Sequence, residues 1–324
     1  MSSEIRHIRN FTAVAVFALC VSLIQPDRAI AEPTWSTAAP LPDTRTEVSL
    51  TTDGDRLYLL GGFGPGTDEV GAPRTVYTYS SSTDSWTRLT QLPQGINHAG
   101  LAHLDGKLYV IGGYQEATFQ PTNSLRVYDL RSDAWREGPP LPTARGALAV
   151  AVHDGHIHAI GGTDANNKNT GAHEVFDPKA DKWTTAPEVP TPRNHIAAAT
   201  VGDEIVVLAG RNAETFTLTV NEIYNVATGA WRRSTDVPTG RSGVAAVELD
   251  GLVYLFGGET DNPAATFDDA ERYDPRSGAW EKLPPMLTAR HGLGAARLTD
   301  KIHVVSGGPE AGMAFSDAHE VLAP

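Results

Sequence analysis

The sequence predicts an all-β fold, a six-bladed propeller with four antiparallel strands in each blade. Three observations support this prediction: a repeat of about 49 residues, glycine pairs that recur in step with it, and short strand signals separated by turns. The chain of 324 residues also contains 31 glycines and 22 prolines, more than a helical bundle tolerates. We therefore expect β-sheet throughout the folded part of the chain.

Residues 1–31 are expected to form a secretory signal peptide ahead of a propeller at residues 32–324. The segment has a basic start at residues 6–9, an apolar stretch at 11–24 and a small-residue cleavage site at residues 29–31. The apolar stretch is shorter than the roughly 20 residues that cross a bilayer. The sequence therefore predicts export to the periplasm or the medium after cleavage near Ala31, with no membrane span.

The composition excludes several classes of site. Cys20 is the only cysteine and lies in the predicted leader, so the exported chain would have no disulfide, thiolate nucleophile or cysteine-ligated metal. The formal net charge of −13 argues against nucleic-acid binding, because phosphate affinity comes from surplus cations. The sequence has no P-loop, GxSxG or HExxH motif. We expect a monomer that binds no cofactor.

Tryptophans and glycine pairs mark the repeat. Six tryptophans are separated by 51, 49, 48, 48 and 49 residues, at Trp35, Trp86, Trp135, Trp183, Trp231 and Trp280. Glycine pairs recur in step at 61–62, 112–113, 161–162 and 257–258, with Ala209-Gly210 and Ser306-Gly307 as weaker forms. The sixth repeat ends at Pro324 before it reaches a tryptophan. The segment around Trp35 is therefore predicted to supply the missing outer strand and close the ring.

The fifth repeat illustrates the four strand signals. Apolar runs at 243–249 and 252–256 flank Asp250-Gly251, and Asp-Gly between apolar runs is a strong hairpin signal. Two further strand signals follow at 270–273 and 279–282. Four antiparallel strands in each of six repeats predict a propeller.

The repeats resemble those of the Kelch family over the whole predicted mature chain. A glycine pair is followed by Tyr-Asp-Pro, as at residues 273–275, and then by a tryptophan such as Trp280. This resemblance implies a Kelch-type propeller, with the N-terminal strand completing the last blade.

The loops that follow the glycine pairs are predicted to carry any functional site. In a four-stranded meander, the connections between the second and third strands lie on the same face as the connections between blades. Here these loops contain about ten residues each, whereas the turns on the other face are tight. Long loops on a rigid scaffold are where binding residues concentrate.

An arginine stands sixteen residues before the glycine pair in five of the six repeats, at Arg45, Arg145, Arg193, Arg241 and Arg290. In one interpretation they form a cationic collar around the axial opening that holds a carboxylate, sulfate or sugar acid. In the other, each guanidinium donates to neighbouring backbone carbonyls. The two interpretations are compatible, and all five are candidate ligand-binding residues.

Two positions further along, the repeats differ. If the strand alternates regularly, these side chains lie on the same side as the arginines; they are Glu47, His98, Ala147, His195, Gly243 and Gly292. Glu47, His98 and His195 are candidate catalytic residues for proton transfer, or the ligands of a facial-triad metal site. The remaining interpretation is a hydrogen-bonded channel filled by polar side chains and water.

Five further residues are candidate ligand-binding groups. Asn97, Asn194 and His291 lie next to the variable position in their repeats. Tyr114 and Arg211 directly follow glycines and are predicted to rim the opening.

The Kelch resemblance implies three classes of function. In Kelch recognition domains, arginines at the places of Arg145, Arg193 and Arg241 grip acidic protein segments. The resemblance to the exported sialic-acid mutarotase implies that Glu47 acts as acid–base group, while Arg145 or Arg193 holds the sugar carboxylate. Galactose oxidase, a copper enzyme, requires a cysteine crosslinked to a tyrosine, which a cysteine-free mature chain excludes.

The sequence favours an exported protein that recognises a small anionic or carbohydrate ligand, or an acidic peptide, at the loop face. A mutarotase acting on an acidic sugar is the first alternative, and a metal-dependent enzyme with a His/Glu site on the axis is the second.

Overall fold

The computed structural model describes residues 32–65, 70–116 and 118–324. Residues Pro33–Pro324 form one compact unit. The predicted signal peptide at residues 1–31 lies outside the described residues, so export stays a prediction. No helix in the described part of the chain is long and apolar enough to cross a membrane.

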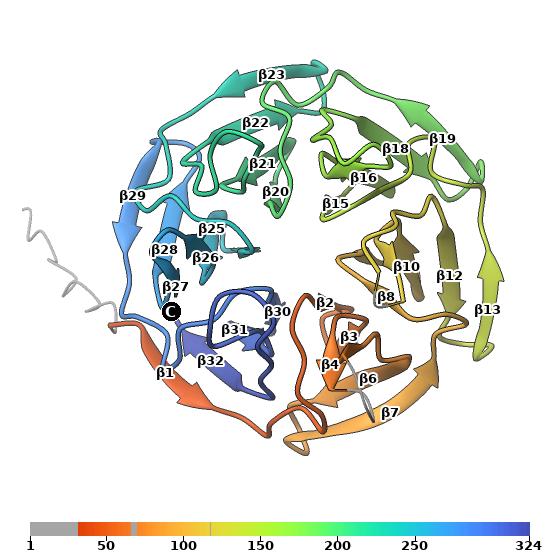
Figure 1. Cartoon of the computed structure of the whole chain (residues 1–324), viewed down its shortest axis with the longest axis horizontal. Helices are drawn as coiled ribbons and strands as arrows, with labels where there is room; N and C mark the ends of the chain where they lie inside the picture. The colour runs from red at the N-terminus through yellow and green to blue at the C-terminus, as the bar shows by residue number, and fades with distance from the viewer. Residues whose placement is uncertain (1–31, 66–69, 117) are drawn as a thin grey trace, which may run out of the picture. The chain divides into compact units, whose positions relative to one another are not determined.

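The described residues form six four-stranded antiparallel sheets, which Figure 1 shows arranged around a central axis. The predicted six-bladed all-β propeller is therefore confirmed. Blade by blade, the strands are β2 (Ser49–Thr52), β3 (Arg56–Leu60), β6 (Thr75–Ser80) and β7 (Ser85–Gln91); β9 (Gly100–Leu104), β10 (Lys107–Ile111), β12 (Leu125–Asp129) and β13 (Ala134–Glu137); β15 (Ala149–His153), β16 (His156–Ile160), β18 (His173–Asp177) and β19 (Lys182–Thr185); β20 (Ala197–Val201), β21 (Glu204–Leu208), β22 (Asn221–Asn225) and β23 (Ala230–Arg233); β24 (Ala245–Leu249), β25 (Leu252–Phe256), β28 (Ala270–Asp274) and β29 (Ala279–Lys282); β30 (Gly294–Leu298), β31 (Lys301–Val305), β32 (His319–Ala323) and β1 (Thr34–Thr37).

Short strand pairs extend some blades toward the loop face. They are β4 (Gly64–Pro65) with β5 (Val70–Gly71), β8 (Ile96–Asn97) with β11 (Tyr114–Gln115), β14 (Arg145–Gly146) with β17 (Thr163–Asp164), and β26 (Glu259–Asp261) with β27 (Ala264–Thr266).

The Asp-Gly dipeptides make the tight turns that the sequence predicts. In the fifth blade, β24 and β25 pair through Leu249 and Leu252, and Asp250 and Gly251 form the turn between them. Both turn residues have positive φ, 54° and 79°. A two-residue hairpin needs this geometry to match the strand twist, and Asp-Gly adopts it readily.

The N-terminal strand closes the ring, as predicted. β1 pairs antiparallel with β32 and places Trp35 opposite Leu322 (Figure 1). The Trp35 ring meets Phe256 of the fifth blade edge-on, with 5.8 Å between the ring centroids. The two ends of the propeller chain therefore hold the same blade together.

The hydrophobic core lies between neighbouring blades. One cluster joins Tyr109 and Ile111 of the second blade to Ile157, Ala159 and Phe176 of the third. Outer-strand tryptophans reinforce these contacts, since the Nε1 of each donates to a carbonyl in the chain segment before the blade. The pairs are Trp35 with Pro284, Trp86 with Ala39, Trp183 with Pro139, Trp231 with Pro187, and Trp280 with Thr235.

The five repeated arginines are structural, and the collar interpretation is wrong. All five are fully buried and face an acidic side chain of their own blade; the pairs are Arg45–Asp43, Arg145–Glu174, Arg193–Glu222, Arg241–Glu271 and Arg290–Glu320. They also donate to backbone carbonyls, as Arg193 does to Val207 and Ala209. A buried guanidinium needs this full set of partners, so none of the five faces a ligand at the axial opening.

The second blade exchanges the members of this ion pair. Ile96 stands where the other blades have arginine, and Arg126 of β12 stands where they have the acidic residue. Arg126 donates to Gln94 at 2.9 Å and lies 3.5 Å from Glu137. The position therefore needs one cation per blade and does not need it to face the axis.

Candidate functional site

A ring of main-chain hydrogen bonds surrounds the propeller axis just before the innermost strands. It is built from the variable position of each blade, and all six residues there have positive φ: 53° at Glu47, 50° at His98, 54° at Ala147, 52° at His195, 67° at Gly243 and 59° at Gly292. From one blade to the next, the N–H at this position donates to the carbonyl of the preceding one, at 3.3, 3.0, 3.0, 3.1 and 2.9 Å. Val48 N–H closes the ring on the Gly292 carbonyl at 3.2 Å.

The left-handed backbone at these positions corrects one prediction. The innermost strands begin after this ring, for example at Ser49, Gly100 and Ala197, and not at the arginines. Because the αL residue reverses the chain direction between arginine and strand, regular alternation does not apply. The arginines therefore turn into the blades, while Glu47 and His98 line the axial cavity.

The ring separates two cavities on the axis. The cavity on the loop face has a volume of about 400 Å³, a size typical of small-molecule sites. The cavity on the other side, about 340 Å³, is lined by the innermost strands, mostly through small and apolar residues. The chemically varied groups of the axis therefore gather at the loop face.

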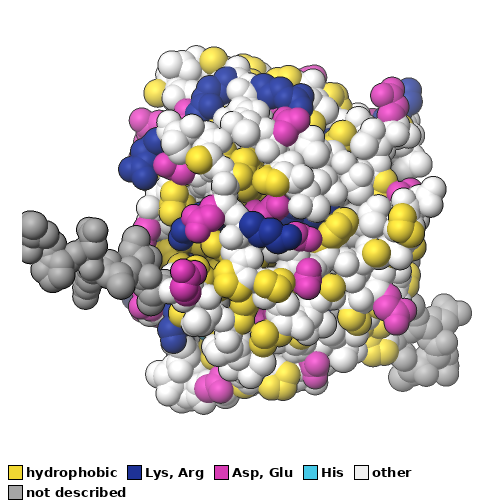
Figure 2. Space-filling model, turned by 90° about the vertical axis from the view of Figure 1, so that its left-hand side faces the viewer, with side chains coloured by type: hydrophobic (Ala, Val, Ile, Leu, Met, Phe, Trp, Pro, Cys, Tyr) yellow, Lys and Arg dark blue, Asp and Glu magenta, His cyan; other side chains and the backbone are white. Residues whose placement is uncertain are grey.

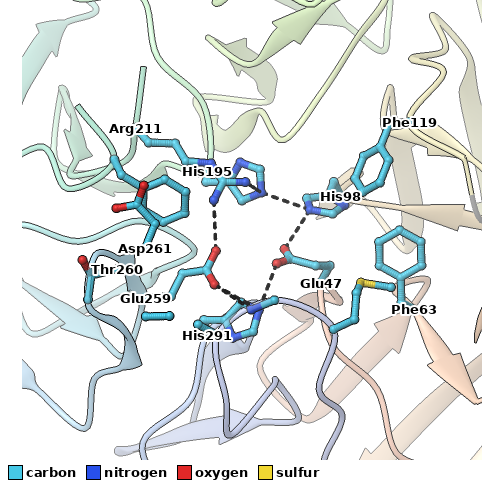
Figure 3. A pocket seen from close by; sticks show the side chains of 15 residues that line it. Glu47, Phe63, His98, Phe119, His195, Arg211, Glu259, Thr260, Asp261 and His291 are labelled. Atoms are coloured by element: carbon cyan, nitrogen blue, oxygen red, sulfur yellow. Dashed lines mark hydrogen bonds and ion pairs between the residues drawn. The ribbon is translucent and has the colours of Figure 1, made fainter. Parts of the chain in front are cut away.

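Six ionisable side chains form the floor of the loop-face cavity (Figure 3); they are Glu47, His98, His195, Arg211, Glu259 and His291. His98 Nε2 lies 3.2 Å from Glu47 Oε2 and 3.1 Å from His195 Nε2. His291 Nε2 stands between the two glutamates, 3.7 Å from Glu47 and 3.6 Å from Glu259. These side chains come from five of the six blades.

Each of the three histidines is oriented by an acceptor behind its ring. His98 Nδ1 lies 2.7 Å from Asn97 Oδ1, and His195 Nδ1 contacts Asn194 Oδ1. The Nδ1 of the third, His291, lies 3.2 Å from the Gly308 carbonyl. Asn97 and Asn194, predicted to bind ligand, instead position the histidines, and every Nε2 faces the cavity.

Burial keeps two of these imidazoles neutral. It lowers the pKa of His98, although the Glu47 carboxylate opposes this effect. It also holds the pKa of His195 well below the ordinary value, and the nearby Arg211 guanidinium adds to the effect. At neutral pH, both rings therefore offer an Nε2 lone pair, the form suited to a base or a metal ligand.

Arg211 links the histidines to the second carboxylate. Its guanidinium donates to Glu259 at 3.0 Å, to His195 Nε2 at 2.9 Å and to Asn194 Oδ1 at 3.3 Å. The same group lies 4.4 Å from the centroid of the Phe216 ring. Arg211 is thus the one predicted arginine that reaches the cavity, and it does so already paired.

The walls of the cavity are aromatic and apolar. Phe63, Phe119, Phe216 and Met313 line it, all from loops that follow the glycine pairs. The exposed surface is 64% for Phe119 and 51% for Met313, unusual for large apolar side chains. Their place in the predicted binding loops was the sequence signal for them, but loop aromatics were not among the candidates.

Tyr114 lies beside the cavity and not in it. Its ring packs edge-on against His98 at 5.3 Å and directly over Gly146, where any side chain would collide with it. Tyr114 instead lines an adjoining loop-face cavity of about 540 Å³, which shares Phe119, His195 and Arg211 with the first.

Comparison with known proteins agrees with this architecture. The family model described as the KLHDC2/KLHL20/DRC7 Kelch-repeats domain matches residues 26–210, more than half of the chain. The Kelch motif matches residues 192–238 and 240–287. The chain belongs to the Kelch-repeat family.

Among curated Kelch proteins, similarity covers part of each chain. Kelch-like protein terF of Aspergillus terreus is 33% identical over 129 residues, which are 38% of this chain and 28% of the relative. Kelch-like protein 36 of Bos taurus is 34% identical over 131 residues, or 40% and 20% of the two chains. Kelch-like protein 35 of Mus musculus is 30% identical over 137 residues, or 42% and 22%. This Kelch chain thus matches under a third of each relative's length.

Kelch-repeat propellers are typical protein-binding domains. In this Kelch propeller, Glu47, His98 and His195 come together as the sequence suggested, and one ligand atom of each lies within 4.8 Å of the others. These three residues form the chemical centre of the loop-face cavity.

Proposed function

We propose that this Kelch propeller is a recognition protein whose loop-face cavity binds a small carbohydrate. The observation that carries the proposal is the pairing of an exposed aromatic wall with a buried polar floor. Phe119 and Met313 are two of the three most exposed large apolar side chains in the described part of the chain, and both border this cavity. Exposed apolar groups at a concave site mark a binding surface.

The floor suits a ligand rich in hydroxyl groups. Carboxylate oxygens of Glu47 and Glu259 and the histidine Nε2 atoms can accept hydrogen bonds from hydroxyls. A sugar ring offers such donors on its edge and an apolar face toward Phe63, Phe119 or Phe216. The cavity of about 400 Å³ accommodates a molecule of this size.

The charge of the cavity favours a neutral sugar over an anion. Glu47, Glu259 and Asp261 line it with Arg211 as the single arginine or lysine, and that arginine is already paired with Glu259. The buried arginines contribute no accessible cation. Figure 2 shows acidic, basic and apolar side chains interspersed on the face in view, without a broad basic patch there. An acidic peptide or sugar acid therefore has less support than a neutral carbohydrate.

Saturation-transfer NMR with galactose, N-acetylglucosamine and glucuronate tests the proposal. We expect transfer to at least one neutral sugar, and Phe119→Ala should weaken its binding by about 10-fold, or 1.4 kcal/mol. Leu287→Ala is the matched control, because Leu287 is also exposed, at 56%, but does not line the cavity. Absence of transfer from all three sugars would contradict the proposal and favour a protein partner.

Acid–base isomerisation of a bound sugar is the second candidate function. It is favoured by the contact between Glu47 and the neutral His98, which provides a base and a proton relay at the cavity floor. Arg145 and Arg193 cannot hold a sugar carboxylate, since both are buried in their blades. NMR of anomer interconversion would detect the activity, and equal rates with wild type and Glu47→Gln would count against it.

The protein is also proposed to act outside the cytoplasm as a monomer. The basic, apolar and small-residue segments at residues 1–31 support export. Expression of the full chain followed by cell fractionation and N-terminal sequencing should give a product that begins at Glu32. A cytoplasmic product that keeps Met1 would contradict the proposal, and size-exclusion chromatography tests the monomer.

A further inference from the structure

The cavity floor brings together three acceptor atoms without a hydrogen between them. The ring of His98 shows this first, because its proton can be placed. Asn97 Nδ2 donates to the Glu116 carbonyl at 2.6 Å, which fixes the amide so that its oxygen faces His98 Nδ1 at 2.7 Å. His98 therefore carries its hydrogen on Nδ1 and presents a lone pair on Nε2.

The same reasoning applies to His195. Its Nδ1 contacts Asn194 Oδ1, and Arg211 Nε donates to that same atom at 3.3 Å. An atom that accepts from a guanidinium is the amide oxygen, so His195 also carries its hydrogen on Nδ1. Its Nε2 is then a second lone pair that points into the cavity.

These two lone pairs face each other and a carboxylate. His98 Nε2 lies 3.1 Å from His195 Nε2 and 3.2 Å from Glu47 Oε2 (Figure 3). The side chains of His98 and Glu47 are only 5% and 13% exposed, so bulk water does not separate them. Three acceptors at this spacing repel one another unless a positive centre lies among them.

We propose that Glu47, His98 and His195 bind one divalent first-row transition-metal ion at the floor of the loop-face cavity. Two imidazole nitrogens and one carboxylate form a ligand set suited to zinc, ferrous iron or cobalt, and it leaves coordination positions open toward the cavity. The site goes beyond the proposed carbohydrate binding and does not depend on it.

The surroundings of the triad match those of a metal site. Asn97 and Asn194 hold the outer nitrogen of each histidine, as the partners of metal-bound imidazoles commonly do. The hydrogen-bonded ring fixes the main chain of all three residues. Gly292 leaves space for Glu47, because a Cβ there would lie 2.7 Å from the Glu47 main-chain nitrogen and Cδ.

Arg211 competes with the metal for one ligand. Its guanidinium donates to His195 Nε2 at 2.9 Å, and this hydrogen bond has to break when the metal binds. Its bonds to Glu259 and Asn194 can keep the side chain at the cavity wall. Removal of the competing cation should therefore raise metal affinity, an effect opposite to that of removing a ligand.

Cobalt titration of the chelator-treated full chain tests the site, through visible absorption and calorimetry. We expect one Co²⁺ per chain, displaced by Zn²⁺. Each of Glu47→Gln, His98→Gln and His195→Gln should weaken binding by about 100-fold or more, since loss of an outer partner alone costs about 10–100-fold. Arg211→Met should bind Co²⁺ more tightly. His153→Gln is the control for surface histidines, because His153 lies outside the cavity.

Two outcomes would overturn the proposal. One is the absence of binding by wild-type protein at about 1 mM Co²⁺, a concentration that would reveal even millimolar affinity; the positive centre would then be a proton on His98. The other is equal binding by wild type and His98→Gln. Since ligand variants can fail to fold, wild type and Arg211→Met decide alone if needed. Sugar titrations with and without chelator separate the proposals: binding that persists in chelator supports the carbohydrate site independently of the metal.

Discussion

Two buried histidine pairs on opposite sides of the propeller should make the protein sensitive to acid. In the third blade, His158 Nδ1 donates to His173 Nε2 at 2.8 Å, and His173 Nδ1 donates to the Pro187 carbonyl at 3.2 Å. In the sixth blade, His303 and His319 repeat the first contact at 2.8 Å. Each pair packs against a tyrosine and a tryptophan of the next blade.

Burial lowers the pKa of His158 and His303 to about 3 and that of His173 and His319 to about 4. In the unfolded chain, a histidine titrates near 6.5. Between these values the unfolded chain binds more protons, so the free energy of unfolding falls as the pH drops from about 6.5 toward 4. From pH 7.5 to 5.0, the expected loss is about 2 kcal/mol for each buried imidazole.

Urea unfolding followed by tryptophan fluorescence, in chelator, measures this loss at pH 7.5 and 5.0. The double variant His158→Gln/His173→Gln removes two of the four imidazoles, so its pH dependence should be smaller than that of wild type by about 4 kcal/mol. The comparison uses the change with pH, which is independent of any stability lost at pH 7.5. His153→Gln, which removes a surface histidine, should leave the pH dependence nearly unchanged. A double variant as acid-sensitive as wild type would refute the reasoning.

Three further predictions concern the frame of the propeller. Glu222→Ala leaves Arg193 buried without its partner and should lower the free energy of unfolding by about 3–5 kcal/mol in chemical denaturation, while Co²⁺ affinity of the folded protein stays unchanged; normal stability with lost ligand binding would restore the collar interpretation. Gly292→Ala should abolish Co²⁺ binding in calorimetry because its Cβ would overlap Glu47, whereas at Gly243 the nearest atom is 3.4 Å away and alanine adds only backbone strain of about 1 kcal/mol; equal effects of the two would exclude the steric argument. Trp183→Ala should cost about 3–5 kcal/mol and Trp183→Phe about 1 kcal/mol in thermal unfolding, since phenylalanine keeps the packing and loses only the hydrogen bond to Pro139; a phenylalanine variant as unstable as alanine would contradict this division.

The fold could be predicted from the sequence because each repeat specifies its own blade. Asp250-Gly251 determines a hairpin by local geometry, and the tryptophan spacing counts the blades. The pairing of β1 with β32 followed from the missing tryptophan in the sixth repeat. These signals are either local or periodic, so they need no knowledge of tertiary contacts.

The candidate site could be predicted only in part. Comparison of equivalent positions found Glu47 and His98, because a position that varies among repeats is free of the architecture. The direction of the arginines could not be obtained from alternation, since the αL backbone between them and the strands is a tertiary feature. Two signals were present: glycine at positions 243 and 292, and an acidic residue in register with the arginine, as Glu222 is with Arg193.

The hub of this propeller is held by main-chain atoms, so its side chains can be exchanged at little expense to the frame. Ala147 occupies the same backbone conformation and the same ring of hydrogen bonds as His98 and His195, which flank it in the neighbouring blades. An aspartate or histidine introduced there would project from an equivalent backbone position beside the existing triad. The axis is in this sense a six-place socket in which chemistry can be reprogrammed one blade at a time while the wheel that carries it stays the same.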